Sequence, residues 1–325
     1  MNIKKIGLTA LGSSLIATSA FAGSLDVTGS AGMSFGGANV GTSANGFSMY
    51  DEVTFSGGGE MDNGWTVNVS YQLDSSETST GNMDNRSLTI DTNGLGVITF
   101  SGHGGDSAMS AVDDVMPTAY GEAWDIISNT LDNGSVGTAA NFNAIGSAGS
   151  NNILSYSNAD LMDGLKLTVS YVPSGTGEVE SSTDFAIEYT GYEGLTVGYA
   201  AGENNAAGGT GNTDNETMYI KYAYGPVTVG YQESEIDATA ATADDEFDAL
   251  GITYQITDSL TVGYTESNYN AGDKTADQES SNMSFSYTAG GITLAGGFAE
   301  EKNRGGETTA QNDVKGYELD LSFAF

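Results

Sequence analysis

Carboxylates dominate the residues of this chain that could do chemistry, and one stretch gathers several of them without a basic partner. Residues 104–150 contain no lysine or arginine, so nothing within the stretch neutralises its acidic side chains. Grouped carboxylates attract cations, repel anions and, where several oxygens converge, bind Ca²⁺. The composition of residues 104–150 therefore predicts that this stretch attracts cations and repels anions. Its acidic residues are Asp106, Asp113, Asp114, Glu122, Asp125 and Asp132.

Covalent catalysis has little support in the rest of the chain. His103 is the only histidine, and there is no cysteine. A nucleophilic serine or threonine normally needs a nearby base, and only His103 could supply an imidazole. The H-E-x-x-H and phosphate-loop patterns are absent. We expect no enzymatic activity and interpret His103 as a polar wall residue, with pH sensing as the less favoured alternative.

Two acidic runs raise the question of calcium. Asp113-Asp114 and Asp244-Asp245-Glu246 offer the oxygen ligands that Ca²⁺ prefers, but neither lies in an EF-hand or nonapeptide repeat. Solvated loop charge is the favoured interpretation. Calcium bridging between loops or to lipopolysaccharide is a minor hypothesis, and no other cofactor is expected.

The net charge restricts the class of partner. The chain carries −34 at pH 7, and without Lys4 and Lys5 it has seven basic and 43 acidic residues, a charge of about −36. Nucleic acid is excluded as a partner, because binding to phosphates needs clustered positive charge.

The first residues have the three parts of an export signal. Lys4 and Lys5 form a basic region, residues 6–17 are mildly apolar, and Ala20-Phe21-Ala22 is a small-x-small cleavage site. We expect a signal peptide over residues 1–22, cleaved after Ala22, and a single domain over residues 23–325. In an exported chain without cysteine, stability must come from the fold itself rather than from disulfides.

Apolar and polar residues alternate through short segments along the whole domain. Residues 195–199 read LTVGY and residues 317–325 read YELDLSFAF, with an apolar or aromatic residue at every second position. Side chains of a strand point alternately to opposite faces, so each segment has one apolar face. About sixteen strands are predicted, over residues 25–35, 49–60, 65–74, 86–91, 97–103, 151–158, 165–172, 184–190, 195–201, 216–224, 227–232, 247–255, 260–266, 281–288, 292–299 and 314–325.

The connections between these segments alternate in length. Short turns such as Gly225-Pro226 alternate along the chain with long polar stretches such as residues 233–246. Short turns at one rim, long loops at the other and one apolar face per strand are typical of a transmembrane antiparallel β-barrel. The fold class is therefore all-β, and residues 104–150 form its third long loop.

Parity predicts which side chains face the interior. Lys166 and Lys221 lie on the polar faces of their strands, and His103 shares that parity at the end of its strand. Arg86 instead shares parity with Leu88 and Ile90, so it belongs at a rim or after a bulge. Charged side chains facing mid-bilayer cost about 2–4 kcal/mol, which favours inward placement.

The chain resembles the Gram-negative general (diffusion) porins, especially those of the alphaproteobacterial type. The resemblance covers nearly the whole chain and rests on the export signal, the strand spacing, Asn93–Phe100 (NGLGVITF), Ala111–Val115 (AVDDV) and the terminal Phe325. It implies a sixteen-stranded barrel, usually a homotrimer, in the outer membrane. The third loop then folds inward to narrow a channel for small hydrophilic solutes.

The resemblance also assigns roles to residues. The loop acids Asp106, Asp113, Asp114, Glu122 and Asp125 would line the constriction. The aromatic carboxyl terminus would be recognised by the barrel-assembly machinery, through Tyr317, Leu319, Leu321, Phe323 and Phe325.

Porins of this family often oppose the acidic loop with arginines of the early strands. Here the inward positions of those strands carry none, which leaves Lys166, Lys221, His103 and Arg86 as candidates for positive charge. We therefore predict a channel that prefers cations. The alternatives are a substrate-selective channel with lumen aromatics such as Tyr219 as a binding track, and a non-conducting structural or adhesive barrel.

Overall fold

A computed structural model describes most of the chain. It covers residues 25–39, 46–74, 83–113, 115–122, 126–127, 151–173, 181–205, 212–238, 244–308 and 312–325. The predicted signal peptide and its cleavage site lie outside these ranges. Within them, no helix has the length and apolar content needed to cross a bilayer.

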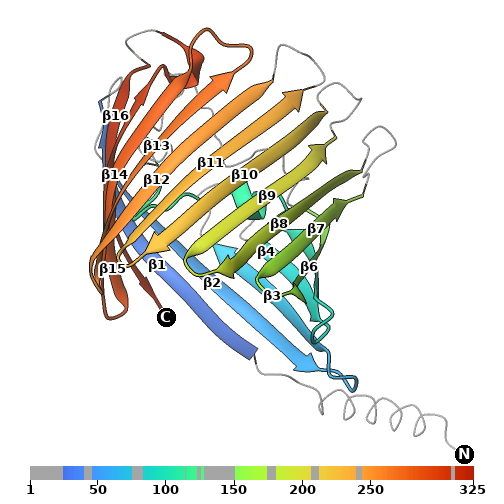
Figure 1. The fold of residues 1–325 in the computed structure, drawn as a ribbon. Helices are drawn as coiled ribbons and strands as arrows, with labels where there is room; N and C mark the ends of the chain where they lie inside the picture. The colour runs from blue at the N-terminus through green and yellow to red at the C-terminus, as the bar shows by residue number, and fades with distance from the viewer. Residues whose placement is uncertain are drawn as a thin grey trace, which may run out of the picture.

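Sixteen antiparallel strands form one closed sheet in which each strand pairs with its sequence neighbours (Figure 1). The ring closes because β1 pairs with both β2 and β16. Closure satisfies every edge by hydrogen bonding, which a sheet in lipid requires. The predicted all-β barrel and its strand number are confirmed. The strands are β1 (Leu25–Ala38), β2 (Gly46–Glu60), β3 (Thr66–Asp74), β4 (Met83–Asp91), β5 (Val97–His103), β6 (Ile153–Met162), β7 (Leu165–Val172), β8 (Ser182–Tyr192), β9 (Leu195–Asn204), β10 (Thr213–Tyr224), β11 (Val227–Ala238), β12 (Asp245–Thr257), β13 (Leu260–Ala271), β14 (Gln278–Ala289), β15 (Ile292–Lys302) and β16 (Val314–Ala324).

The connections alternate in length as predicted. Short turns join β2 to β3, β4 to β5 and each later even-numbered strand to the next, and they all lie at the lower rim in Figure 1. Asn93 (φ 55°) and Gly94 (φ 97°) adopt left-handed backbone in the β4–β5 turn, which explains the Asn-Gly pair there. The strand ends that the long connections join lie at the opposite rim.

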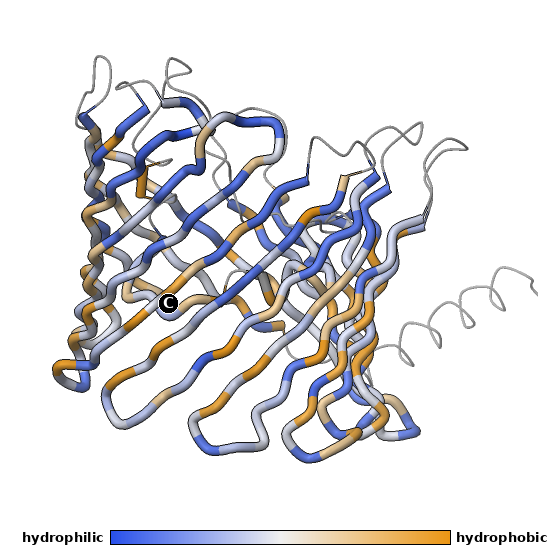
Figure 2. Tube along the Cα trace, turned by 45° about the horizontal axis from the view of Figure 1, so that its top comes forward, coloured by the Kyte–Doolittle hydropathy of each residue, from blue (hydrophilic) through white to orange (hydrophobic). Residues whose placement is uncertain are grey.

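Several strands extend further towards the long-loop rim than their alternation indicated. β11 continues from the expected end at Gln232 to Ala238, through Glu233, Glu235 and Asp237. The outward positions of this end are the three acids, so the apolar outward face that marks a strand in lipid is lost although the pairing continues. Figure 2 shows hydrophilic residues concentrated towards this rim.

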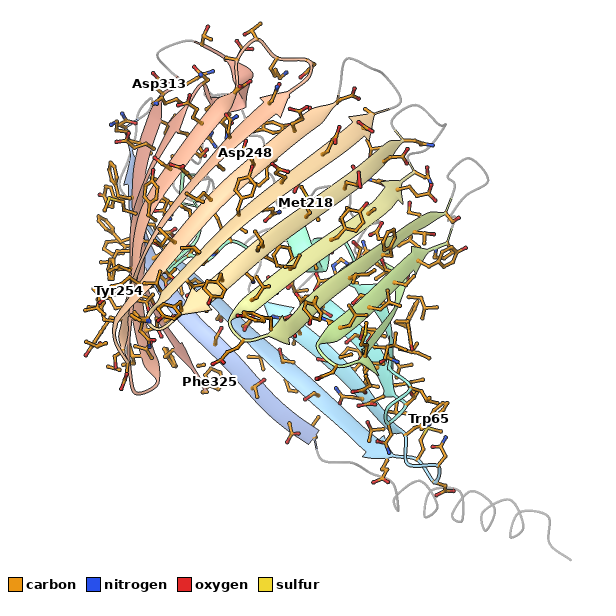
Figure 3. The ribbon with its side chains drawn as sticks, viewed as in Figure 1. Trp65, Met218, Asp248, Tyr254, Asp313 and Phe325 are labelled. Atoms are coloured by element: carbon orange, nitrogen blue, oxygen red, sulfur yellow. The ribbon has the colours of Figure 1, made fainter. Side chains whose placement is uncertain are left out.

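The outer face carries an apolar band with acids on the long-loop side. On β12, Leu250, Ile252 and Tyr254 are exposed and point outward, and Asp248 lies above them on the same face. Figure 3 shows Tyr254 on the outside near the short turns and Asp248 closer to the opposite rim. This is the arrangement of a lipid-facing band bounded by interfacial polar residues.

The carboxyl terminus takes part in closing the ring. The backbone N–H of Phe325 donates to the carbonyl of Gly29 at 2.9 Å, and the N–H of Gly29 donates back to Phe325 at 2.9 Å. Tyr317, Leu319, Leu321, Phe323 and Phe325 are all exposed on the outer side. The segment predicted to be an assembly signal therefore also forms the last strand of the barrel.

Candidate functional site

The connection between β5 and β6 enters the barrel instead of remaining at the rim. Within residues 107–113, 115–122 and 126–127 of this connection, apolar side chains pack against inward-facing side chains of the wall. A short helix, α2 (Ser110–Asp113), contacts β9 and β10 and is visible behind them in Figure 1. The predicted inward fold of the third loop is confirmed for these residues, which we call the constriction loop.

An apolar cluster holds the first half of the constriction loop. Met109 is fully buried, and Val112 and Met116 are each 6% exposed. They share a cluster with small or aromatic wall residues of four strands, namely Ala186, Ala200, Tyr219, Phe247 and Ala249. Burial of side chains of this size stabilises by roughly 1.5–3 kcal/mol each, which offsets part of the conformational entropy lost when the segment is ordered.

Hydrogen bonds fix the loop backbone at separate points of the wall. The N–H of Ala108 donates to Ser170 Oγ of β7 at 2.8 Å. On β14, Asn282 Nδ2 donates to the carbonyls of Gly121 at 2.7 Å and Tyr120 at 3.3 Å. The N–H of Ala119 donates to Ser284 Oγ at 3.3 Å.

A second apolar cluster fixes the far end of the described loop. Ile126 and Ile127 are fully buried against Ala299 of β15 and Val314 of β16, with Ala38 of β1 nearby. The loop thus follows the inner wall from β7 to the β16–β1 seam. Apart from Ala38 of β1, these contacts involve β7 and later strands, so most of the inner wall of β1–β6 faces the loop from the opposite side.

The structure describes two of the predicted constriction acids. Asp106 is exposed at the start of the loop, whereas Glu122 is only 6% exposed. Burial of Glu122 was not expected from a solvated acidic loop. The side chains of Asp113, Asp114, Asp125 and Asp132 lie outside the described residues.

The wall opposite the loop and the β16–β1 seam supply carboxylates that the sequence-based selection of site residues missed. Glu52 of β2 accepts hydrogen bonds from Ser30 Oγ (3.1 Å) and from Gln72 Nε2. At the seam, Asp320 accepts a bond from Tyr50 at 3.1 Å, and Glu318 lies two residues away on the same inward face. Parity within YELDLSFAF already placed both acids opposite the apolar face, but the segment was interpreted only as an assembly signal.

Tyr120 of the constriction loop lies against this acidic seam. Burial and the neighbouring carboxylates Glu318 and Asp320 raise the pKa of its phenol, which stays protonated and can donate to them. The hydroxyls of Tyr120 in the loop and Tyr50 in β2 therefore both approach carboxylates of β16, which links the loop to β16 and β16 to β2.

The candidate basic residues are few and scattered. Lys166 of β7 points inward near the short-turn rim, beside a cavity of about 570 Å³ that Glu60, Asp91 and Asp160 also line. Lys221 of β10 points inward as predicted, with its Nζ 5.3 Å from the centre of the Tyr219 ring. Among the described strands, these are the only inward-facing lysines or arginines.

The prediction for His103 is wrong in its facing. A register shift between Arg86 and Ser87 pairs His103 with Arg86, whereas Ser101 pairs with Ser87. The bulge places His103 on the outer side with Arg86, where its Nδ1 lies 2.5 Å from Asn151 Oδ1. A bulge of this kind was foreseen for Arg86, but its effect on His103 was not.

Tyr219 does not form an open aromatic track. It is 3% exposed under the constriction loop, and its hydroxyl donates to Glu188 of β8. Its ring anchors the loop, so the sequence-based alternative that used Tyr219 for solute binding loses its main residue. Among the described residues, no group of three His, Cys, Asp or Glu side chains is arranged to hold a metal ion.

Comparisons with known proteins agree with this architecture. A family model described as Gram-negative porin matches residues 7–323. No curated protein matches the sequence. The solved structures show extensive structural similarity at low sequence identity.

An anion-selective porin from Comamonas acidovorans is similar at 14% identity and a TM-score of 0.71, covering 93% of this chain and 99% of that one. OmpT of Vibrio cholerae in its trimer form is 13% identical with a TM-score of 0.66, covering 94% and 100%. Salmonella typhi OmpF in complex with daunomycin is 14% identical with a TM-score of 0.65, covering 93% and 98%. The family match, over nearly the whole chain, and the closed sixteen-stranded barrel together show that this protein belongs to the Gram-negative porins and is an outer-membrane diffusion channel.

Proposed function

We propose that the channel passes small hydrophilic solutes and prefers cations, with the constriction loop and the β16–β2 wall forming its narrow section. The loop acids Asp106, Asp113, Asp114, Glu122 and Asp125 contribute negative charge from one side. Passage needs no chemistry, because a hydrated lumen replaces the lipid barrier and charged side chains set the potential along the path.

One observation carries the cation preference: the wall that faces the acidic loop carries an inward carboxylate, Glu52, and no positive charge that would balance the loop. Glu52 points inward there, and no lysine or arginine lies on the described inward positions of β1–β4. Glu318 and Asp320 add two inward carboxylates at the seam beside Tyr120, where they are 7% and 5% exposed. Because both sides of the narrow section are acidic, the electrostatic potential of the lumen is negative throughout. An electric field across the pore, from a basic wall to an acidic loop, is not formed. Acidic rings of this type concentrate cations and exclude anions.

The two inward lysines do not reverse this balance. Lys166 stands directly opposite Glu188 in the register, and three further carboxylates share its cavity. Lys221 lies over the Tyr219 ring on the wall that the loop covers. Neither lysine lies on a strand next to β2, so neither is placed to neutralise Glu52.

Reversal potentials in planar bilayers test the proposal. Purified, refolded protein in a potassium chloride gradient is expected to give a potential of the sign set by K⁺. A potential of the sign set by Cl⁻ would overturn the cation preference, while leaving the channel itself intact. The similarity to an anion-selective porin makes the measurement informative, because the shared fold does not decide the sign.

The same bilayer recordings distinguish two other functions from a general diffusion channel. Tight, saturable block of the current by one class of solute would favour a substrate-selective channel. Absence of any conductance from folded protein would favour a structural or adhesive barrel.

The same proposal includes the partners of the barrel. Outer-membrane lipid and lipopolysaccharide would contact the apolar band, and the assembly machinery would recognise Tyr317, Leu319, Leu321, Phe323 and Phe325. We further propose a homotrimer, in keeping with the trimer form named for a similar structure, and cleavage after Ala22. Calcium at the loops stays a minor hypothesis, which unchanged thermal unfolding after chelation would remove.

A further inference from the structure

Three strands repeat the sequence Thr-Val-Gly-Tyr, at residues 196–199, 228–231 and 261–264. Alternation explains the valine and tyrosine, which face outward, and the threonine, which faces inward. It does not explain the glycine, which occupies an inward position where any small polar residue would satisfy the pattern. Glycine inside a strand weakens it and often marks a close approach of another segment.

The constriction loop makes that approach at β11 and β12. A Cβ atom added to Gly230 would lie 2.5 Å from Cδ of Pro117 and 3.2 Å from its Cγ. Gly251 is the direct partner of Gly230 in the register. A Cβ there would lie 2.7 Å from the carbonyl oxygen of Pro117 and 3.0 Å from its nitrogen.

The contact continues over the next three strands. A Cβ at Gly263 would lie 2.9 Å from the nitrogen of Ala119. Ser284 pairs with Gly263 on one side and with Gly297 on the other, and it accepts the hydrogen bond from Ala119. A Cβ at Gly297 would meet Cδ1 of Ile126. The missing side chains on four of these strands therefore leave room for the loop backbone.

We propose that Gly230, Gly251, Gly263 and Gly297 form a seat that determines how far the constriction loop stands from the wall. The seat thereby sets the open cross-section and the size limit for solutes. This inference rests on the proposed role of the loop as the constriction. Ser170 and Val314 hold the two ends of the loop. Side chains added at the four glycines would therefore displace the middle of the loop towards the opposite wall.

Two single substitutions separate the kinds of contact. In Gly230→Ala the new methyl meets the proline ring, whereas in Gly251→Ala it meets the main chain of Pro117 as well. Each is expected to lower single-channel conductance, by roughly 10–30%, because a narrower pore carries less current. Pro117→Ala removes Cγ and Cδ, so it is expected to restore conductance in Gly230→Ala but not in Gly251→Ala.

A matched control adds the same methyl elsewhere. Ser70 of β3 faces inward on the wall opposite the loop, and Ser70→Thr is expected to leave conductance at the wild-type level. Wild-type conductance in both glycine variants would overturn the seat. An equal response of the two variants to Pro117→Ala would also overturn it.

A distance measurement tests the seat without relying on conductance. The chain has no cysteine, so spin labels can be placed on Thr118→Cys in the loop and Thr54→Cys on the facing wall. Gly251→Ala is expected to shorten the mean distance between the labels, and an unchanged distance would refute the seat. A wild-type protein that conducts nothing would instead refute the proposed function.

Discussion

Single inward residues decide the electrostatics of this channel, and Glu52 is the most direct test. It lies on the uncovered wall with Ser30 and Gln72 as hydrogen-bond partners. Glu52→Gln keeps the shape and removes the charge, so we expect a lower ratio of K⁺ to Cl⁻ permeability, by roughly two- to threefold. The reversal potential in a salt gradient measures this ratio.

Lys221→Met provides the matched opposite change. It removes positive charge from the lumen and is expected to raise the same permeability ratio, by less than Glu52→Gln lowers it, because Lys221 lies on the loop-covered side. A fall in the ratio for Lys221→Met, or no change for Glu52→Gln, would contradict the proposed distribution of charge.

Residue-level predictions from the sequence were accurate where pairing is regular. Lys166 and Lys221 face inward because parity is preserved between each of them and the apolar residues of its own strand. His103 faces outward because one bulge lies between it and the rest of β5. Bulges depend on the partner strand and the adjoining loop, so parity within one strand does not reveal them.

At the scale of elements, the constriction loop depends on a small number of wall contacts. Asn282→Ala removes both bonds to the carbonyls of Tyr120 and Gly121, each worth about 1 kcal/mol. We expect a loosened loop, recorded as increased open-channel current noise. Ser286→Ala, four residues away on the same inward face, serves as the control and is expected to leave the current noise unchanged.

A buried ion pair organises the connection between β15 and β16. Arg304 Nε lies 3.1 Å from Glu301 Oε2, with side-chain exposures of 7% and 0%. The short 3-10 helix η2 (Arg304–Gly306) carries the arginine, and Gly305 N–H donates to Gln278 of β14 at 2.9 Å. The pair fixes this connection against the neighbouring strand.

Arg304→Met leaves the Glu301 carboxylate buried without its cation, which costs about 3–5 kcal/mol. We expect faster hydrogen exchange in residues 303–308 while the barrel strands stay protected. The double variant with Glu301→Gln is expected to recover much of the protection, since it removes the uncompensated charge. Equal exchange in Arg304→Met and wild type would show that the pair does not hold the connection.

The whole molecule is a cylinder with an apolar exterior and a polar interior, and β12 allows both faces to be tested with one residue type. Ile252 faces outward and Thr253 inward. Arginine on the lipid face near the bilayer midplane destabilises by about 2–4 kcal/mol. Ile252→Arg is therefore expected to lower the free energy of unfolding from lipid vesicles, measured by urea titration, much more than Thr253→Arg. Equal effects would mean that the two faces are misassigned.

The sequence alone determined the barrel, because two local signals repeat throughout it. Period-two alternation marked the strands, and alternating connection lengths marked the two rims; both depend only on neighbouring residues and on the difference between lipid and water. The ends of strands such as β11 escaped detection because their outward face is acidic instead of apolar.

Only the tertiary structure decided how the loop and the wall side chains are arranged inside the barrel. The described residues of the constriction loop contact strands that lie some 60 to 200 positions away in the chain, and their path over Gly230, Gly251, Gly263 and Gly297 depends on volumes that no local pattern records. The burial of Tyr219, the outward turn of His103 and the acidic seam at Glu318 and Asp320 arise in the same way. Alternation states which face a side chain takes, whereas packing between distant segments determines what covers that face.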